Sequence, residues 1–230
     1  MTLRWALWPR LPYDEAVTLQ GRLVAARRGG GDDCAMAVEH EPVVTLGRRT
    51  DAADVGLPLA ELARRGVSVR RTERGGLATY HGPGQLVVYP VVDVRWLGVR
   101  RYVALLEAVA LAVVDAAGLA GETRPGSPGV WVADAKVAAV GVRVTGGIAS
   151  HGLAVNLTMD VTPFGWIRPC GVAGGVVGAL DALGGRPLAL ADAARVAVAR
   201  LAAGLAATPQ EVRPAALDPA VDSLGAVARR

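Results

Sequence analysis

A glycine-rich stretch at residues 73–85 constrains this chain more than any other part of its sequence. It follows a strand-like run at residues 67–70 and precedes an alternating apolar run at residues 86–94. It combines four glycines with a proline, an arginine, a tyrosine and a histidine, a mixture that a simple strand connection does not need. Glycine permits positive φ and lets backbone N–H groups approach a bound molecule closely. We therefore predict a binding loop on a rigid scaffold, with an ordinary hairpin as the alternative.

The bulk composition predicts one globular domain. The chain has 230 residues, of which 52% are hydrophobic and 20% charged, enough for a substantial core and unlike a disordered protein. A membrane span would need roughly 18 uncharged residues, and even the apolar run at 103–120 contains Glu107 and Asp115. The apolar run at residues 5–8 is too short for the core of a signal peptide. We expect a cytoplasmic protein without membrane contact.

Charge and cysteine content argue against several classes of site. The net charge is +4, but only 4% of residues are aromatic and no basic run alternates with them, so we expect no nucleic-acid partner. The two cysteines, Cys34 and Cys170, lie far apart, so no disulfide is expected in the cytoplasm. Together with the three histidines they lack zinc-site spacing. Cys34 stands among small apolar residues and is predicted to be a buried structural thiol.

The single lysine, Lys136, is unusual in a chain whose other 24 basic residues are arginines. Arginine does not usefully lose its proton, whereas burial and neighbours can tune a lysine. Lys136 is therefore a candidate for proton chemistry. A surface position without function is the alternative.

The order of predicted elements favours an α/β (α+β) fold, a single domain with a mixed β-sheet flanked by helices. Helices are predicted at residues 13–28, 58–65, 102–118 and 191–206, and strands at 3–8, 34–39, 43–46, 67–70, 86–94, 130–132, 136–144 and 153–157. His40 is expected in the turn between two strands, with a position lining a site as the weaker alternative, and residues 145–152 form a second loop with a His-Gly pair. The catalytic domain is predicted to span residues 1–207. Residues 208–230, with three prolines, are predicted to be a peripheral tail.

Cys170 and Lys136 are the strongest candidates for chemistry. The sequence contains no Gly-x-x-x-x-Gly-Lys phosphate loop, no His-Glu-x-x-His and no Gly-x-Ser-x-Gly. A cysteine attacks as its thiolate, which a nearby lysine ammonium stabilises. A partly desolvated lysine can also exchange a proton near neutral pH. Their separation in the sequence leaves open whether they form a catalytic pair or are two structural residues.

Five blocks of this sequence resemble the lipoyl(octanoyl) transferase family. They are residues 74–86, 129–132, 136–143, 151–156 and 169–171, which occur in the family's order and at compatible spacings. The resemblance extends over roughly residues 12–205. It implies the fold shared by biotin and lipoate protein ligases.

The resemblance implies transfer of an octanoyl group from acyl carrier protein to the ε-amine of a lysine on a lipoyl domain. Such acceptors are 2-oxoacid dehydrogenase subunits and the glycine-cleavage H protein. Cys170 matches the nucleophile that forms an acyl thioester, and Lys136 matches its basic partner. The implied substrate-binding residues are Arg74, Gly75, Gly76, Leu77, Ala78, Thr79, Tyr80, His81, Ala139, Val140, Gly141, His151, Gly152 and Leu153. No ATP, metal or other cofactor is implied, and we expect a monomer.

Three alternatives remain open. A lipoate or biotin protein ligase would use ATP, and Gly75, Gly76 and His81 also suit such an enzyme; the Pro-Cys-Gly block and Lys136 favour the transferase. An amidotransferase that moves acyl groups between lipoyl domains would differ in its donor. A binding module without turnover would not need Cys170 or Lys136. Residues 147–150 are smaller and less polar than in many relatives, which leaves the acyl-chain preference open.

Overall fold

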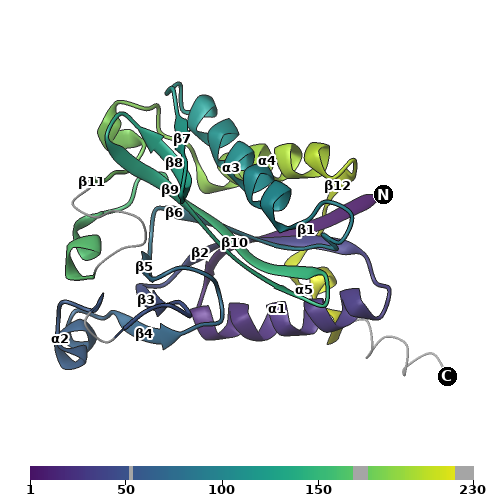
Figure 1. Cartoon of the computed structure of the whole chain (residues 1–230), viewed down its shortest axis with the longest axis horizontal. Coiled ribbons are helices and arrows are strands. Elements are labelled where there is room, and N and C mark those ends of the chain that lie inside the picture. Colours follow the sequence, from purple (N-terminus) through teal and green to yellow (C-terminus); the bar gives the residue numbers. More distant parts are fainter. Residues whose placement is uncertain (52–53, 168–175, 221–230) are drawn as a thin grey trace.

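A nine-stranded mixed sheet forms the centre of the computed structural model, which describes residues 1–51, 54–167 and 176–220 (Figure 1). The strand order is β12-β1-β2-β6-β10-β9-β8-β7, and β11 pairs with β9. β1 is parallel to β2 and to β12, whereas the pairs from β2 to β7 along this order are antiparallel. The strands are β1 (Thr2–Leu11), β2 (Asp33–His40), β6 (Gln85–Val91), β7 (Glu122–Arg124), β8 (Ser127–Val132), β9 (Ala135–Thr145), β10 (Ile148–Asn156), β11 (Val176–Val177) and β12 (Thr208–Glu211).

A smaller three-stranded sheet stands beside the large one. It consists of β3 (Val43–Leu46), β4 (Ser68–Arg71) and β5 (Ala78–His81), and α2 (Leu59–Arg64) precedes β4. β5 lies inside the glycine-rich stretch, so the predicted loop is wrong for these four residues. Their side chains alternate between two faces, as in any strand. The rest of the stretch connects this strand to its neighbours.

Helices cover both faces of the large sheet (Figure 1). α3 (Val99–Ala116) and α4 (Leu190–Gly204) pack together on one face, and α1 (Tyr13–Arg28) covers the other. On α3 the buried residues recur at helical spacing: Tyr102, Leu105, Leu106, Val109 and Val113. Full burial of each leucine or valine stabilises the fold by about 1.5–3 kcal/mol. The predicted mixed sheet flanked by helices is confirmed.

The second predicted loop is mostly strand. Only Gly146 and Gly147, with φ of 60° and 83°, form the turn between β9 and β10. Two-residue hairpin turns favour such positive φ values. His151 therefore lies in β10, paired with Val142, and not in a loop.

Residues 208–220 are attached to the domain. β12 extends the large sheet beside β1, and α5 (Pro214–Leu217) buries Leu217. Arg4 donates a hydrogen bond to the carbonyl of Ala216 at 2.6 Å. In the described part of the tail, the chain beyond residue 207 therefore packs against the domain and is not a separate unit. Two short 3₁₀ helices, η2 (Thr162–Trp166) and η3 (Asp181–Leu183), complete the described elements. None of the described helices is long and apolar enough to cross a membrane.

Candidate active site

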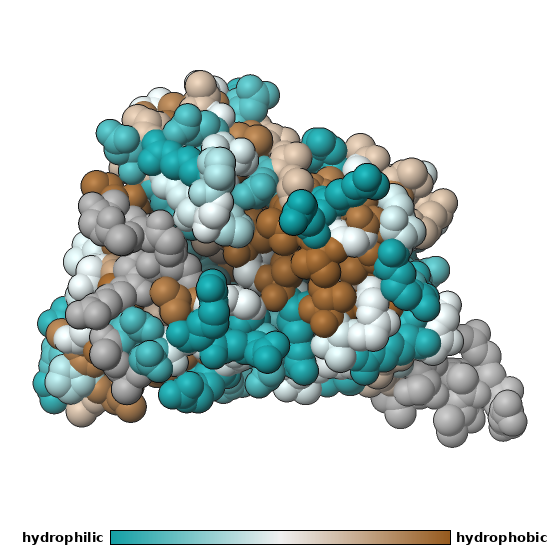
Figure 2. Space-filling model, in the orientation of Figure 1, coloured by the Kyte–Doolittle hydropathy of each residue, from teal (hydrophilic) through white to brown (hydrophobic). Residues whose placement is uncertain are grey.

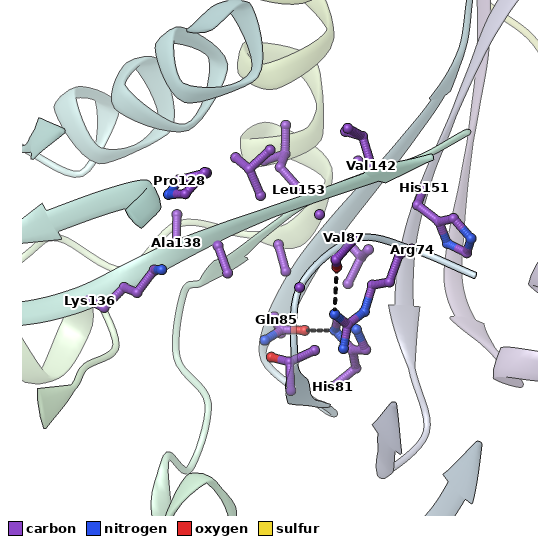
Figure 3. Close-up of a pocket in the computed structure, with 18 of the residues that line it drawn as sticks. Arg74, His81, Gln85, Val87, Pro128, Lys136, Ala138, Val142, His151 and Leu153 are labelled. Carbon is purple, nitrogen blue, oxygen red and sulfur yellow. Dashed lines mark hydrogen bonds between the residues drawn. The ribbon is translucent and has the colours of Figure 1, made fainter. Parts of the chain in front are cut away.

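A cavity of about 280 Å³ lies between the two sheets, lined by residues of β5, β6, β9 and β10. Lys136 stands at one end, and Arg74, His81 and His151 stand at the other (Figure 3). Val140 and Val142 line it and are only half-buried, so the cavity is not sealed on the β9 side. Figure 2, in the orientation of Figure 1, shows hydrophobic surface over the β9–β10 hairpin, bordered by hydrophilic residues. Such a space suits a largely apolar ligand with polar groups at fixed points.

Most of the predicted site residues line this one cavity. They are Lys136, Arg74, Gly75, Gly76, Thr79, His81, Ala139, Val140, Gly141, His151, Gly152 and Leu153. Leu77, Ala78 and Tyr80 are not among the lining residues. On β5 Thr79 and His81 face the cavity, whereas Ala78 and Tyr80 pack into the core of the small sheet, where the Tyr80 ring lies 5.8 Å from that of Phe164. Cys170 lies outside the described residues.

Lys136 is buried at the start of β9, with 6% of its surface exposed. Its Nζ donates a hydrogen bond to Ser127 Oγ at 3.3 Å and lies 4.6 Å from the centroid of the Trp131 ring. Gly129, at φ +143°, makes room for it: a Cβ there would lie 2.2 Å from the Ala138 carbonyl oxygen and 2.8 Å from Lys136 Cε. The Gly-Val-Trp block thus shapes the surroundings of the lysine.

The chain that follows the Pro-Cys-Gly block returns beside Lys136. Val177 pairs with Lys136 in the parallel β11–β9 pair and lines the cavity. The Gly178 N–H donates to the Lys136 carbonyl oxygen at 3.1 Å. Lys136 therefore lies beside Val177 and Gly178, which follow Cys170 by seven and eight positions in the sequence.

At the opposite end, the backbone and Thr45 hold the guanidinium of Arg74. Arg74 is 7% exposed, and its Nη2 donates to the Thr45 carbonyl oxygen at 2.7 Å and to Thr45 Oγ1 at 2.8 Å. Its Nη1 donates to the Gly75 carbonyl oxygen at 3.1 Å. Gly47 permits this packing, because a Cβ there would lie 2.5 Å from the Gly76 carbonyl oxygen. The arginine is a rigid part of the wall.

All three histidines of the chain gather at the Arg74 end. The His40 ring centroid lies 5.8 Å from that of His81 and 5.7 Å from that of Tyr89, and the Tyr89 ring lies 6.2 Å from His151. Burial lowers the pKa of His40 to about 4, of His81 to about 3 and of His151 to about 4. These histidines are therefore neutral at neutral pH.

His40 belongs to this cluster, so its prediction as a turn residue is wrong. It ends β2 and is fully buried. Its Nδ1 donates to the Leu11 carbonyl oxygen at 2.8 Å, which leaves Nε2 to accept from the Tyr89 hydroxyl at 2.8 Å. Both ring nitrogens are satisfied without a charge.

Sequence reasoning gave no role to two buried amides that connect the ends of the cavity. His81 Nδ1 donates to Gln85 Oε1 at 2.7 Å, and Gln85 Nε2 donates to Asn156 Oδ1 at 2.9 Å. Asn156 Nδ2 then donates to the Gly178 carbonyl oxygen at 2.8 Å. Both amides stood inside the recognised blocks, and a buried polar residue in an apolar strand is the signal that could have identified them.

Two further residues lie away from the centre of the site. Cys34 is buried as predicted, and desolvation raises the pKa of its thiol to about 12. Such a thiol is not a nucleophile at neutral pH. Arg49, from the basic loop at residues 47–50, lines the cavity although its side chain is exposed. In the described ranges no three His, Cys, Asp or Glu side chains lie close enough to hold a metal ion.

Comparisons of the sequence with known proteins identify the family to which the chain is similar. A family model described as the lipoyl protein ligase A/B catalytic domain matches residues 12–202. The octanoyltransferase of Chloroflexus aurantiacus is 39% identical over 207 residues, which cover 87% of this chain and 93% of the relative. The octanoyltransferase of Rubrobacter xylanophilus is 41% identical over 187 residues, which cover 80% and 85%.

The structural comparison shows the fold. A lipoate-protein ligase A bound with ATP matches with a TM-score of 0.78 at 13% identity, over 96% of this chain and 92% of that one. The predicted ligase-like fold is confirmed. The identity and coverage of the sequence relatives show that this chain is a transferase enzyme. The chain therefore belongs to the lipoyl protein ligase A/B catalytic-domain family, among its octanoyltransferases.

Proposed function

We propose that this enzyme moves an octanoyl group from octanoyl-acyl carrier protein to the ε-amine of a lysine on a lipoyl domain. The intermediate is a thioester on Cys170. The observation that carries the proposal is the position of Lys136, buried at one end of an apolar cavity and paired in β-structure with the chain that follows Cys170. Membership of the octanoyltransferases supports the same chemistry.

The reaction divides into two acyl transfers. The Cys170 thiolate attacks the carbonyl carbon of the donor thioester, and the donor's carbon–sulfur bond breaks to release its thiolate, which takes a proton from the Lys136 ammonium. In the second transfer the acceptor amine attacks the Cys170 thioester, the carbon–sulfur bond to Cys170 breaks to restore its thiolate, and Lys136 accepts the proton that the amine loses. Exchange between thioesters is nearly isoenergetic and amide formation runs downhill, so neither step needs ATP.

Both transfers pass through a tetrahedral oxyanion, which requires nearby N–H donors. β8 pairs with β9 only as far as Ala139, so at Val140 and Gly141 the edge of β9 opposite β10 borders the cavity. The backbone amide of Val140 on that edge, with those around Cys170 and Gly171, is our candidate donor. The octanoyl chain would extend along β9 toward the histidine end, past Leu153 and Val87, where the lining is apolar.

Intact-mass measurement after incubation with octanoyl-acyl carrier protein, without ATP, tests this function. We expect a gain of one octanoyl group on the wild type and none on Cys170→Ser. Neutral hydroxylamine should release the group, and an apo-lipoyl domain should remove it and gain the same mass. These results together establish a thioester that lies on the transfer route.

Other outcomes would support the alternatives. If the lipoyl domain gains an octanoyl group only when octanoate and ATP are added, the protein is a ligase. If an octanoylated lipoyl domain loads Cys170 and the carrier protein does not, it is an amidotransferase. If the carrier protein binds and no mass change follows, the chain is a binding module.

A further inference from the structure

A second cavity of about 490 Å³ opens beside the first at the Lys136 end. One wall is α3, where Arg100, Val103, Ala104 and Glu107 follow the i, i+3, i+4, i+7 spacing of a single helix face. The other wall is the end of β7 and the turn that leads to β8, at residues 123–126, together with Pro128. We call this space the α3 groove.

The α3 groove is continuous with the main cavity. Val103, Gly126 and Pro128 line both spaces. Ser127, between two of them in sequence, accepts the hydrogen bond from Lys136 Nζ. A linear ligand in the groove would therefore enter the main cavity next to the lysine.

We propose that the α3 groove binds the phosphopantetheine arm of the acyl donor, with Arg100 contacting its phosphate. The inference rests on the proposed function, because that function requires a thioester donor at the Lys136 end. The arm is linear, has two amide groups and ends in a phosphodiester. Val103 and Pro128 offer apolar walls for its methylene groups. Glu107 accepts the Gly129 N–H at 3.1 Å through Oε1, and a carboxylate has further lone pairs for an amide of the arm.

One arginine of the groove is placed to bind the phosphate of the donor. Arg100 is exposed on the groove wall, where a guanidinium can bind a phosphate oxygen by a charge-assisted hydrogen bond. Arg124, the other arginine of the groove, donates to Glu122 Oε1 at 2.8 Å and to the Ala133 carbonyl oxygen at 2.8 Å. Arg100 is therefore the residue that we assign to the phosphate.

Two small donors that differ only in the phosphate test this assignment. Octanoyl-phosphopantetheine and octanoyl-pantetheine would each be used to acylate Cys170, with the rate followed by intact mass. For the wild type we expect kcat/KM about tenfold higher with the phosphorylated donor, the range of one hydrogen bond to a charged group. Arg100→Ala should abolish this preference and leave the rate with octanoyl-pantetheine unchanged.

Arg101→Ala is the matched control. Arg101 is the next residue of α3 and is exposed, and it lines neither cavity. This variant should keep the tenfold preference. A second variant, Ala104→Trp, fills the groove from an exposed position and should slow loading from octanoyl-acyl carrier protein at least tenfold, while a truncated donor such as octanoyl-N-acetylcysteamine still loads.

The outcomes separate the two proposals. If octanoyl-acyl carrier protein leaves Cys170 unmodified in the wild type, the proposed function fails, and the inference fails with it. If Cys170 loads and Arg100→Ala keeps the preference for the phosphorylated donor, only the inference is overturned. Equal loss of preference in Arg100→Ala and Arg101→Ala would overturn the inference, because it would show a general effect of positive charge and not a specific contact of Arg100 with the phosphate. Normal loading of Ala104→Trp from the carrier protein would place the arm elsewhere.

Discussion

The two ends of the cavity hold ionisable side chains in different ways. At one end Lys136 lies against a hydroxyl and an aromatic ring, beside the α3 groove. At the other end three histidines and Tyr89 pack together, and burial holds the pKa of each histidine at about 3–4. Both ends are buried, and burial keeps the three histidine rings neutral at neutral pH.

This difference suggests separate roles for the two ends: proton transfer at one end and shaping of the cavity at the other. A proton acceptor must be able to change its charge during the reaction, whereas a ring that packs against an apolar chain must stay uncharged. The histidine rings meet this second requirement, because each hydrogen bond found for His40 and His81 is compatible with a neutral ring. We therefore assign proton transfer to the Lys136 end and acyl-chain accommodation to the histidine end.

The largest expected effect comes from replacing Lys136. Lys136→Met should lower the rate of octanoyl transfer by about 10²–10⁴-fold, the range of a general acid–base group. Lys136→Arg keeps the positive charge but does not usefully lose its proton, so it should retain part of the Cys170 loading and lose transfer to the acceptor amine. Single-turnover mass measurements of each half-reaction distinguish the two variants.

A variant at the opposite end of the cavity serves as the control for Lys136→Met. His81→Gln, at the other end, should change either half-reaction by much less than Lys136→Met. If His81→Gln abolishes transfer and Lys136→Met does not, proton chemistry belongs to the histidine end and our assignment is reversed.

The next effect concerns the space around the lysine. Gly129→Ala places a Cβ against the Ala138 carbonyl oxygen and Lys136 Cε, so it should destabilise the fold by about 3 kcal/mol and reduce transfer. Denaturant unfolding and the transfer assay measure the two consequences. Gly21→Ala is the control, because nothing lies within 4 Å of its added Cβ and it stands on the exposed side of α1. We expect that control to gain about 0.5–1 kcal/mol. Equal stability of both variants would contradict this account.

The sequence predicted the Lys136 end better than the histidine end. Lys136 was identifiable because composition isolates it, and the strand that carries it was identifiable from alternation. Residues that lie in one block, such as Gly129 and Trp131, also stay near each other in the fold. These inferences need only local pattern and a resemblance of short blocks.

The histidine end depends on contacts between distant parts of the chain. His40 was predicted in a turn because it lies between the strands predicted at 34–39 and 43–46, yet β2 carries it into the core beside His81 and Tyr89. Gln85 and Asn156 meet only because β6 and β10 are neighbours in the sheet. No local pattern specifies such a pairing, so their roles required the structure. Cys170 remains a prediction, since it lies outside the described residues.

A smaller effect should follow from cutting the link between the ends. Asn156→Ala leaves the Gly178 carbonyl oxygen and one Gln85 donor without their buried partner, at a cost of about 1–3 kcal/mol. Because Gly178 also pairs with the Lys136 backbone, loading of Cys170 should slow as well. Thermal unfolding and intact-mass loading test both effects. Tyr102→Phe is the control: its buried hydroxyl has no hydrogen-bond partner among the described residues, so its removal should cost little.

The smallest effect concerns pH and the histidine end alone. A histidine whose folded pKa is lowered binds fewer protons in the folded state than in the unfolded chain, so stability is full above about pH 6.5 and falls on acidification toward pH 4. Between pH 6.5 and 5.5 this loss should be about 1 kcal/mol for each histidine. His40→Gln removes one such group, so its unfolding free energy should fall by about 1 kcal/mol less than that of the wild type over this interval. Parallel denaturant titrations at the two pH values measure the slopes. If both proteins lose the same stability, His40 does not resist protonation in the fold, and the neutral character that distinguishes this end from the Lys136 end would rest on His81 and His151 alone.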